Sequence, residues 1–342
     1  MPVHSVIKYM KRYRLVLLGA LFTAIQLATF AQKRGNAFRP YSTVGLGVGT
    51  SSYVGEMAGY STPFATVFKM MRWNVGGTYT RQVSPHFAAR VGFTWARISG
   101  DDYTFNLNQP DIRFLRNLHF RNDIKEFSLI GMYFLRADGR SSDRRAQFNP
   151  YIFAGIAAFS HNPVARVPEK LREIYGNKWI ALQPLGTEGQ GQPGYANPYS
   201  LFGVAIPFGA GFRYKINDRM NIGAELGFRF TNTDFLDDVS GLYADPNVLS
   251  SVLAKAMSNR SQEVVAARKL EGDRTDAVRQ YLVSQKLFPN DSRLNPLSNP
   301  IEGQTTGDPR GSSGRNDTYL LGTITFSYVL RGRSNLSCPV IR

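Results

Sequence analysis

The amino-acid sequence predicts an all-β protein, an eight-stranded antiparallel transmembrane β-barrel with long, partly helical loops at one end. Apolar residues alternate with glycine, polar and charged residues over segments of ten or more residues, which is the period of a strand. The face opposite the apolar one consists of glycines and charges, which suits the narrow polar interior of a barrel. The connections between these segments are alternately short and long, as in barrels that cross a membrane.

Residues 1–31 have the pattern of a secretory signal peptide. An apolar run from Leu15 to Ala31 follows a basic stretch, and small residues occur near Ala28 and Ala31. The basic residues are Lys8, Lys11, Arg12 and Arg14. We expect cleavage after Ala31, and the alternative is an uncleaved anchor helix. In both cases the remaining chain leaves the cytoplasm.

Composition limits the class of protein and its partners. The chain has 342 residues, 43% of them hydrophobic, and its mean hydropathy of −0.25 is too low for a bundle of membrane helices. The formal net charge is +16, and removal of the four basic signal residues leaves +12. An exported chain rarely meets nucleic acid, so we expect no nucleic-acid partner. Outer-membrane lipids and lipopolysaccharide, or an acidic protein surface, are the expected counterparts.

Eight segments show the strand pattern, and each is long enough to cross a bilayer when tilted. They are residues 41–53, 73–82, 87–99, 124–135, 148–161, 204–215, 222–231 and 317–331. The first has a glycine-rich face, and the third alternates apolar residues with arginine, glycine and threonine. The fourth and fifth are apolar on both faces, so the period does not say which face points inward. Eight is an even number, as in bacterial barrels of OmpA or OmpX size.

The sixth and seventh strands form the clearest hairpin. Every second residue is apolar from Val204 to Tyr214 and again from Ile222 to Phe230. Pro207 would delete a ladder hydrogen bond, so we expect a bulge there. The eighth strand repeats the pattern, with leucine, isoleucine and aromatic residues opposite threonine and serine.

Charged residues occupy the predicted inner face. An apolar cup would bury them at a large desolvation cost, which argues against a soluble barrel with its apolar face inward. We expect them to pair as structural contacts inside a filled barrel without a useful pore. They are Arg90, Arg213, Glu225 and Arg229.

The connections predict which ends face the periplasm. Those after the second, fourth and sixth strands are short, and short turns are periplasmic in transmembrane barrels. Both termini are then periplasmic. The N-terminal segment 32–40 precedes the barrel (41–331), and the tail 332–342 follows it. An interfacial girdle of aromatic residues is expected near this end. Its members are Tyr79, Tyr133, Tyr151, Tyr214 and Tyr328.

Residues 233–316 form an 84-residue connection that is too long to be wholly uncommitted. Apolar spacing predicts helices at Pro246–Met257, Ser261–Leu270 and Asp276–Lys286, followed by irregular chain from 288 to 315. We expect this extracellular segment to cap the barrel mouth or to offer a partner surface, rather than to insert into the membrane. The connection 161–200 shows no convincing helical pattern.

The sequence contains little that indicates catalysis or metal binding. No two histidines have metal-ligand spacing on one element, so we expect no metal and no cofactor. His119, Ser128 and His161 leave a hydrolase site formally open, but no spacing signature supports an enzyme. Asp234, Asp237 and Asp238 lack the spacing of a calcium loop. Turn capping is the preferred role for these three aspartates, and calcium binding is the alternative.

One segment resembles a known family. The run Thr231–Tyr243 follows a strand of the form Gly223-x-Glu225-x-Gly227-x-Arg229, and it resembles the same segment of the PorG-like outer-membrane barrels of Bacteroidetes. The residues that carry this resemblance are Asp234, Phe235, Leu236, Asp237, Asp238, Val239, Ser240 and Gly241. The resemblance covers the barrel from about residue 41 to 331.

The resemblance implies a role in the type IX secretion system. The protein would be a non-enzymatic component that anchors or positions the machinery and contacts the periplasmic ring of PorK and PorN. Its working surface would be the turn 136–147 and the tail 331–342. Candidate contacts there are Arg136, Arg140, Arg144, Arg145 and Cys338, the last as a partner in a mixed disulfide. The alternatives are that the arginines only solubilise the turn, and that the barrel stands alone and adheres through its outer loops.

Overall fold

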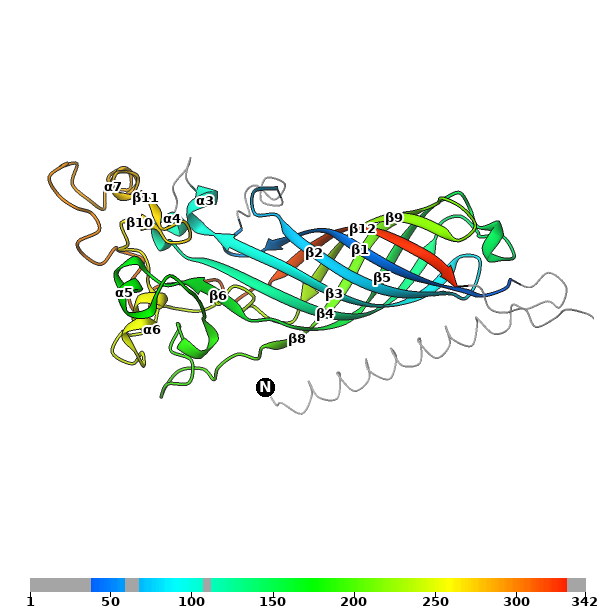
Figure 1. The fold of residues 1–342 in the computed structure, drawn as a ribbon. Coiled ribbons are helices and arrows are strands. Elements are labelled where there is room, and N and C mark those ends of the chain that lie inside the picture. The colour runs from blue at the N-terminus through cyan, green and yellow to red at the C-terminus, as the bar shows by residue number, and fades with distance from the viewer. Residues whose placement is uncertain (1–37, 59–67, 107–111, 331–342) are drawn as a thin grey trace, which may run out of the picture.

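Eight long antiparallel strands close into a barrel in the computed structural model, which describes residues 38–58, 68–106 and 112–330 (Figure 1). Each strand pairs with the next barrel strand along the chain, and the last pairs with the first. The strands are β1 (Tyr41–Val54), β2 (Arg72–Gln82), β3 (Phe87–Asp101), β4 (His119–Phe134), β5 (Phe148–Ser160), β8 (Phe202–Lys215), β9 (Met220–Thr231) and β12 (Thr318–Leu330). All eight predicted strands are confirmed, in an up-and-down order.

Side chains alternate between the barrel interior and its outer surface. On β1, Leu46 and Val48 are 75% and 61% exposed, and both lie on the outer face. On β4, Phe127 is 57% exposed whereas the adjacent Glu126 is 1% exposed, which decides the orientation that the sequence left open. The outer surface of the strands is therefore an apolar belt, and a belt of this kind faces lipid in transmembrane barrels.

β8 keeps one register along its whole length. Pro207 pairs with Arg229 of β9 in the same register as its neighbours. On the side facing β5, the pairing stops for two residues beside Pro207 and then resumes without a shift. The expected bulge at Pro207 is therefore wrong. Proline removes an N–H from the ladder, but the strands on both sides remain aligned.

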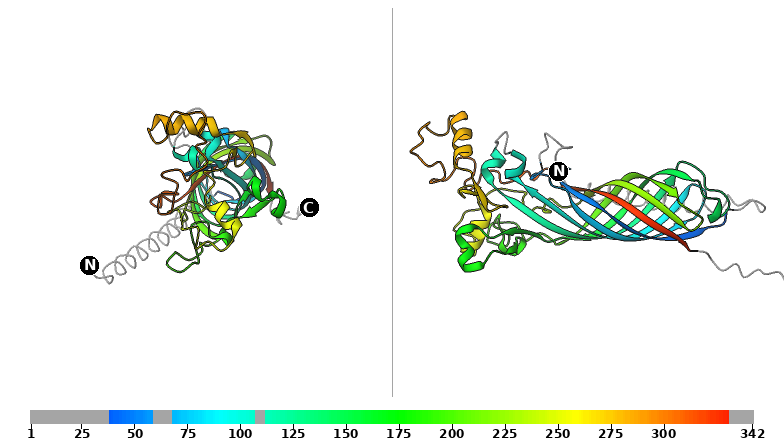
Figure 2. Two further views of the ribbon diagram at one scale, coloured as in Figure 1. Left: turned by 90° about the vertical axis from the view of Figure 1, so that its left-hand side faces the viewer. Right: turned by 45° about the horizontal axis from the view of Figure 1, so that its top comes forward.

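The two ends of the barrel differ. The turns 83–86, 135–147 and 216–219 lie at one end, together with the beginning of β1 and the end of β12 (Figure 1). We call this the turn end. The long connections lie at the opposite end, which we call the loop end, and Figure 2 shows them gathered around the barrel mouth. The expected signal peptide (1–31) and tail (332–342) lie outside the described residues.

The loop end contains structure that the sequence did not predict. β6 (Pro163–Arg166) pairs with the loop-end portion of β4, and β7 (Trp179–Ala181) pairs with β6. The short helix α5 (Arg172–Tyr175) lies in the same connection as β6 and β7, and the short helices α3 (Asp102–Asn106) and α4 (Ile112–Arg116) lie in the connection between β3 and β4. These elements are only three to five residues long, which is too short for a hydrophobic period to emerge.

The segment 233–316 contains two of its three predicted helices. α6 (Val252–Ser258) begins later than expected, where Ser251 caps the helix by accepting a hydrogen bond from Ala254 N at 3.0 Å. α7 (Thr275–Ser284) lies where predicted.

The helix expected at Ser261–Leu270 is wrong, because this stretch enters a small hairpin of β10 (Val265–Ala266) and β11 (Glu271–Asp273). Leu270 and Gly272 have positive φ angles of 60° and 84°, which turn the chain back on itself.

Candidate functional site

The predicted interior charges lie inside the barrel and form ion pairs. Arg90 on β3 reaches across to Glu225 on β9 in a two-pronged ion pair, with one of its two bonds at 2.9 Å. Arg229 Nε lies 3.3 Å from Glu126 Oε2, and Arg213 Nη2 lies 2.6 Å from an oxygen of Asp138. Each predicted charge thus has a partner of opposite sign, which offsets the cost of burying it. The expectation of paired interior charges agrees with these contacts.

Two of the acidic partners were not recognised in the sequence. Glu126 lies on β4, which is apolar on both faces, and Asp138 lies in the turn that follows β4. Tyr151 was expected in the outer girdle, but it is 5% exposed and its hydroxyl donates to Glu225 inside the barrel. Its place in the girdle is therefore wrong. Tyr151 follows the inward alternation of β5, where Phe153 is also buried.

The remaining predicted girdle tyrosines lie on the outer surface. Tyr79, Tyr133, Tyr214 and Tyr328 are between 39% and 46% exposed. On the loop-end side, Trp73 and Trp95 lie edge to face with ring centres 5.2 Å apart. The apolar belt is thus bordered by tyrosines on one side and tryptophans on the other, which is the pattern of a membrane-spanning surface.

Side chains fill the interior between the two ends. The spaces that remain beside the Arg90–Glu225 pair have volumes of about 60 Å³ and about 40 Å³. Both are lined by these two residues together with threonines of β2 and β12. Spaces of this size hold a few water molecules rather than a solute. The filled interior that the sequence predicted agrees with these volumes.

The segment that carries the family resemblance closes the loop end of the barrel. Leu236 and Val239 are fully buried in an apolar cluster at the mouth. Their neighbours there include Tyr53 of β1, Phe120 of β4 and Tyr319 of β12. We call residues 234–241 the plug segment. Because the plug segment contacts strands from three sides of the barrel, it seals the mouth and ties the strands together.

Three polar groups share hydrogen bonds beneath the plug segment. The Tyr53 hydroxyl lies 2.7 Å from Asp237 Oδ2 and 2.6 Å from Asp317 Oδ1, and it accepts from Glu56 N at 3.0 Å. A hydroxyl has a single proton, so it can donate to only one of the two carboxyl groups. The other carboxyl group must supply a proton of its own. Burial accordingly raises the pKa of Asp237 and of Asp317 well above the ordinary value. The charge of Asp317 adds to the rise in pKa at Asp237, and the charges of Asp234 and Glu56 add to the rise at Asp317.

A second polar network joins the plug segment to the loop 161–201. Asp238 accepts from Thr187 and Tyr199 at 2.5 and 2.7 Å. Glu188 accepts from the backbone N–H groups of residues 240 and 241, at 2.9 and 3.0 Å. Arg310 lies 2.9 Å from Glu188 and donates to the Asp238 carbonyl at 2.6 Å. These hydrogen bonds therefore connect the plug segment, the loop 161–201 and the chain around Arg310 to one another.

The three aspartates of the plug segment do not share one site. Asp237 faces Tyr53, and Asp238 faces Thr187 and Tyr199. Burial raises the pKa of Asp234 and of Asp238 to about 6. Among the described residues, no group of three or more metal-ligating side chains is arranged to hold an ion. The side chain of Asp237 caps a turn by accepting from Val239 N at 2.9 Å.

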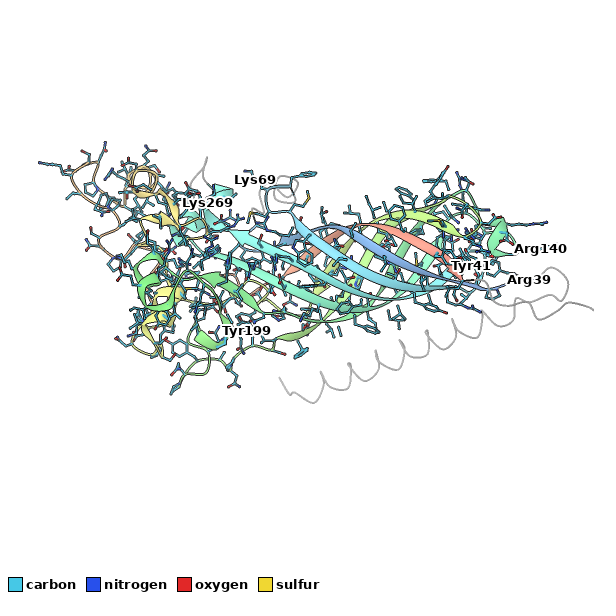
Figure 3. All side chains as sticks on the ribbon, in the orientation of Figure 1. Arg39, Tyr41, Lys69, Arg140, Tyr199 and Lys269 are labelled. Carbon is cyan, nitrogen blue, oxygen red and sulfur yellow. The ribbon has the colours of Figure 1, made fainter. Side chains whose placement is uncertain are left out.

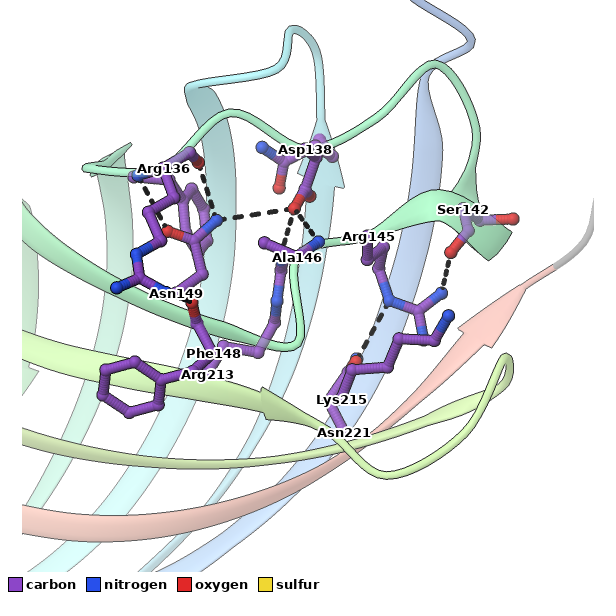
Figure 4. Close-up of polar contacts among 12 residues, drawn as sticks. Arg136, Asp138, Ser142, Arg145, Ala146, Phe148, Asn149, Arg213, Lys215 and Asn221 are labelled. Carbon is purple, nitrogen blue, oxygen red and sulfur yellow. Dashed lines mark hydrogen bonds and ion pairs between the residues drawn. The ribbon is translucent and has the colours of Figure 1, made fainter.

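Arg145 holds the turns together at the opposite end (Figure 4). This side chain is only 4% exposed, and it donates to Asn221 at 3.1 Å and to backbone carbonyls of its own turn and of the turn 216–219. Asp138 accepts from Ala146 N and Arg213 nearby. Arg145 is therefore a buried residue with a structural role, whereas the sequence suggested an exposed contact for a periplasmic partner.

The other arginines of this turn are exposed. Arg136 lies over the ring of Phe148, and Arg140 and Arg144 extend into solvent. Figure 3 shows Arg140 beside Arg39 and Tyr41 at the turn end, with Lys269 and Tyr199 at the loop end. Arg39 N donates to the Arg140 carbonyl at 2.8 Å. Cys338 lies outside the described residues.

The histidines and the serine considered for catalysis are dispersed. Ser128 lies on β4 inside the barrel, nine residues from His119, which is roughly 30 Å along a strand. His119 Nε2 accepts from Arg166 N, and His161 contacts the Ser200 carbonyl, both at 3.0 Å. These side chains have separate structural partners and form no common site.

Fold and surface together define a small transmembrane β-barrel of the outer-membrane type, with a filled interior and a capped mouth. Within the part of the chain that the structure describes, no helix has the length and apolar character needed to cross a membrane. Residues 21–183, which include β1 to β7, match the family model of a domain of unknown function, DUF6089. No curated protein matches the sequence.

Several solved outer-membrane structures are similar in fold. One is the attachment invasion locus protein Ail of Yersinia pestis, in complex with the heparin analogue sucrose octasulfate, at 7% identity, with 86% of this chain and 100% of that chain covered and a TM-score of 0.33. The outer membrane protein OprG of Pseudomonas aeruginosa has 9% identity, coverage of 88% and 100%, and a TM-score of 0.33. The N-terminal β-barrel domain of OprF from the same organism has 8% identity, coverage of 85% and 100%, and a TM-score of 0.32.

Proposed function

We propose that this protein is a non-enzymatic barrel of the outer membrane that anchors or positions the type IX secretion machinery. The observation that carries the proposal is the filled interior, in which the spaces beside Arg90 and Glu225 are about 60 and 40 Å³. A barrel filled in this way and sealed by its plug segment acts through its surfaces rather than by conducting a solute. The secretion role is supported by the resemblance of Thr231–Tyr243 to PorG-like barrels.

The turn end is the proposed partner surface, facing a periplasmic ring of the PorK and PorN type. Arg136, Arg140 and Arg144 expose three positive charges on one turn, and Arg145 and Asp138 hold that turn in a fixed shape. A rigid basic surface favours an acidic protein partner, because little conformational entropy is lost on docking. On this proposal both termini are periplasmic.

Charge reversal tests the partner surface. The double variant Arg140→Glu and Arg144→Glu should lose the copurifying ring lipoprotein in detergent extracts of the native host. The matched control reverses two exposed cations at the loop end, Lys269→Glu and Arg315→Glu, and should retain the lipoprotein. A clean monomer from the unaltered protein, or equal recovery of the lipoprotein with both double variants, would count against the proposed contact.

Cys338 offers a separate test of the same proposal. On the periplasmic side its thiol would form a mixed disulfide with the partner. Non-reducing gels of native membranes should then show a larger species that disappears in a Cys338→Ser variant. An unchanged band pattern together with intact secretion would eliminate the disulfide but not the basic contact.

The second candidate is a stand-alone barrel that binds or adheres through its loops. It is favoured by the ordered core of the outer segment, where α4 packs on α7 through Phe114, Leu115, Val278 and Leu282. Arg274 is fully buried there and donates to the carbonyls of Phe114 and Leu115. Replacing residues 242–309 with a short linker separates the two functions. If the protein adheres through these loops, the replacement should abolish adhesion and leave secretion intact. If the protein is a secretion component, the replacement should leave adhesion of the cells unchanged.

A further inference from the structure

The lipid-facing belt contains an open hollow near the loop end. Its volume is about 670 Å³, which lies within the range of small-molecule sites. The hollow extends over the outer face of four consecutive barrel strands, β4, β5, β8 and β9. Its apolar lining consists of Phe127, Leu129, Ile156, Ala157, Ala158, Val204, Ala205, Ile206 and Phe230. We call it the wall groove.

The interrupted ladder beside Pro207 explains why the wall groove lies there. Pairing between β5 and β8 is missing for Gly155 and Ile156, opposite Pro207 and Ile206. Gly155 lies so close to β4 that a Cβ atom on it would be 2.1 Å from the Leu129 carbonyl oxygen. No side chain can therefore be placed at Gly155, and the small side chain of Ala158 leaves the floor of the groove open.

The groove has a polar outer end and an apolar inner end. Phe127 and Ala158 are register partners on its floor, and the next outward-facing pair toward the loop end is Lys125 with Ser160. Lys125 is exposed, and its neighbour Asp123 is held by Arg97 in a two-pronged pair at 2.6 and 2.7 Å. The charge of Asp123 is thus matched by Arg97. Lys125 lies two residues from the groove residue Phe127 on the same outward face of β4, just beyond the end of the groove.

Two amides complete the outer end. Asn232 and Asn316 line the groove on the side of β9 and β12. Asn232 accepts from Val204 N at 2.9 Å through its Oδ1 atom, so its amide nitrogen is oriented away from β8. Hydrogen-bond donors and a positive charge therefore lie where the belt meets the outer membrane surface, and hydrocarbon side chains lie below them.

We propose that the wall groove binds one acyl chain of an anionic membrane lipid, with the lipid phosphate against Lys125. Position within the belt selects a membrane lipid over a water-soluble ligand, since the groove opens toward hydrocarbon. Lys125 selects an anionic headgroup over a zwitterionic one. This site is separate from the turn end and does not depend on the secretion role.

The test is lipid binding by the full-length, delipidated protein in detergent, measured by native mass spectrometry. The probes are dipalmitoyl phosphatidylglycerol and dipalmitoyl phosphatidylcholine. Ala158→Trp fills the groove and should weaken binding of the first retained lipid by about tenfold or more. Ala154→Trp is the matched control, because Ala154 is also an exposed alanine on the outer face of β5 but lies outside the groove.

Headgroup selectivity is tested separately. Lys125→Gln should reduce the preference for phosphatidylglycerol over phosphatidylcholine severalfold, whereas Lys69→Gln, also exposed at the loop end, should leave it unchanged. Equal lipid retention by Ala158→Trp and Ala154→Trp would overturn the site. Displacement of the lipid by inorganic phosphate alone would show a simple anion site and would overturn the acyl-chain assignment.

Discussion

Arg90 and Glu225 face each other across the barrel interior from β3 and β9, strands that are not neighbours in the sheet. Their side chains are only 9% and 12% exposed, so the pair stabilises the barrel by a contact through its centre. Tyr151 donates to the same carboxylate. The pair and Tyr151 therefore join β3, β5 and β9 through the barrel interior.

Removing one member of this pair should destabilise the barrel strongly. Arg90→Met leaves the Glu225 carboxylate buried without its partner, and we expect a loss of about 3–5 kcal/mol. The double variant Arg90→Met and Glu225→Gln should recover much of that loss. Urea unfolding in detergent, followed by the mobility of folded and unfolded barrel on unheated gels, measures both. A single variant as stable as the unaltered protein would contradict the structural role of the pair.

The proton that one of the carboxyl groups of Asp237 and Asp317 must carry makes the stability of the plug segment depend on pH. Burial raises the pKa of Asp237 and Asp317 above that of an unfolded aspartate, and raises the pKa of Glu56 to about 7. Near pH 4 the unfolded chain begins to release these protons while the folded plug segment retains them. Stability should therefore be greatest at acidic pH and should fall as the pH rises from about 4 to about 7.

Asp317→Asn tests this dependence. An amide nitrogen can donate to Tyr53 while Tyr53 donates to Asp237, so each contact then has its own proton. We expect a gain of about 1 kcal/mol near neutral pH and a flatter pH profile, measured by hydrogen exchange in the plug segment. A steeper profile, or a loss of stability at neutral pH, would count against a protonated carboxyl group beside Tyr53.

Leu236 should be the main apolar anchor of the plug segment. Leu236→Ala removes a fully buried side chain from the cluster at the mouth and should cost about 2–5 kcal/mol. Leu242→Ala is the control, because Leu242 directly follows the plug segment and is 56% exposed. Limited proteolysis should cleave the loops of the first variant sooner while the barrel strands remain intact. Similar cleavage of the two variants would show that Leu236 does not hold the plug segment.

Arg145 should stabilise the turn end. Arg145→Ala removes the charged donor from the carbonyls of Ser142, Asn217 and Asp218, and we expect a loss of about 1.5–3 kcal/mol. Arg144→Ala removes an exposed arginine one residue earlier and should change stability by no more than about 0.5 kcal/mol. Thermal unfolding in detergent compares the two. Equal melting temperatures would place Arg145 among the surface charges instead.

The strands were predictable because their period is a local property of the chain. The alternation on β8 and β9 is visible in the sequence, and it located Arg213, Glu225 and Arg229 on the inner face before any pairing was known. The orientation of β4 and β5 was not predictable, since both faces are apolar and only closure of the barrel decides that Glu126 and Tyr151 point inward.

The site depends on contacts between distant parts of the chain, and these leave no local pattern. Asp237 was placed in a turn-capping cluster, but its contact with Tyr53 joins residues 184 positions apart. Arg145 looked like its neighbours Arg140 and Arg144 because they share a basic turn, and only the fold brings Asn221 beside it. Pro207 predicted an irregularity, although its form, a gap without a register shift, required the neighbouring strand.

The pairing of β12 with β1 has a consequence for biogenesis. Ser42 pairs with Leu330 and Val54 with Thr318, so the sheet cannot close until nearly the whole chain has arrived. Before that moment β1 presents an open edge, which is an aggregation hazard for a chain in transit. Asp317 immediately precedes β12, and its bonds to Tyr53 and Leu236 secure the last strand at the step that closes the ring. The final strand therefore closes the barrel. A chain truncated before Thr318 should fail to close and be degraded by proteases, and it should not form a smaller barrel.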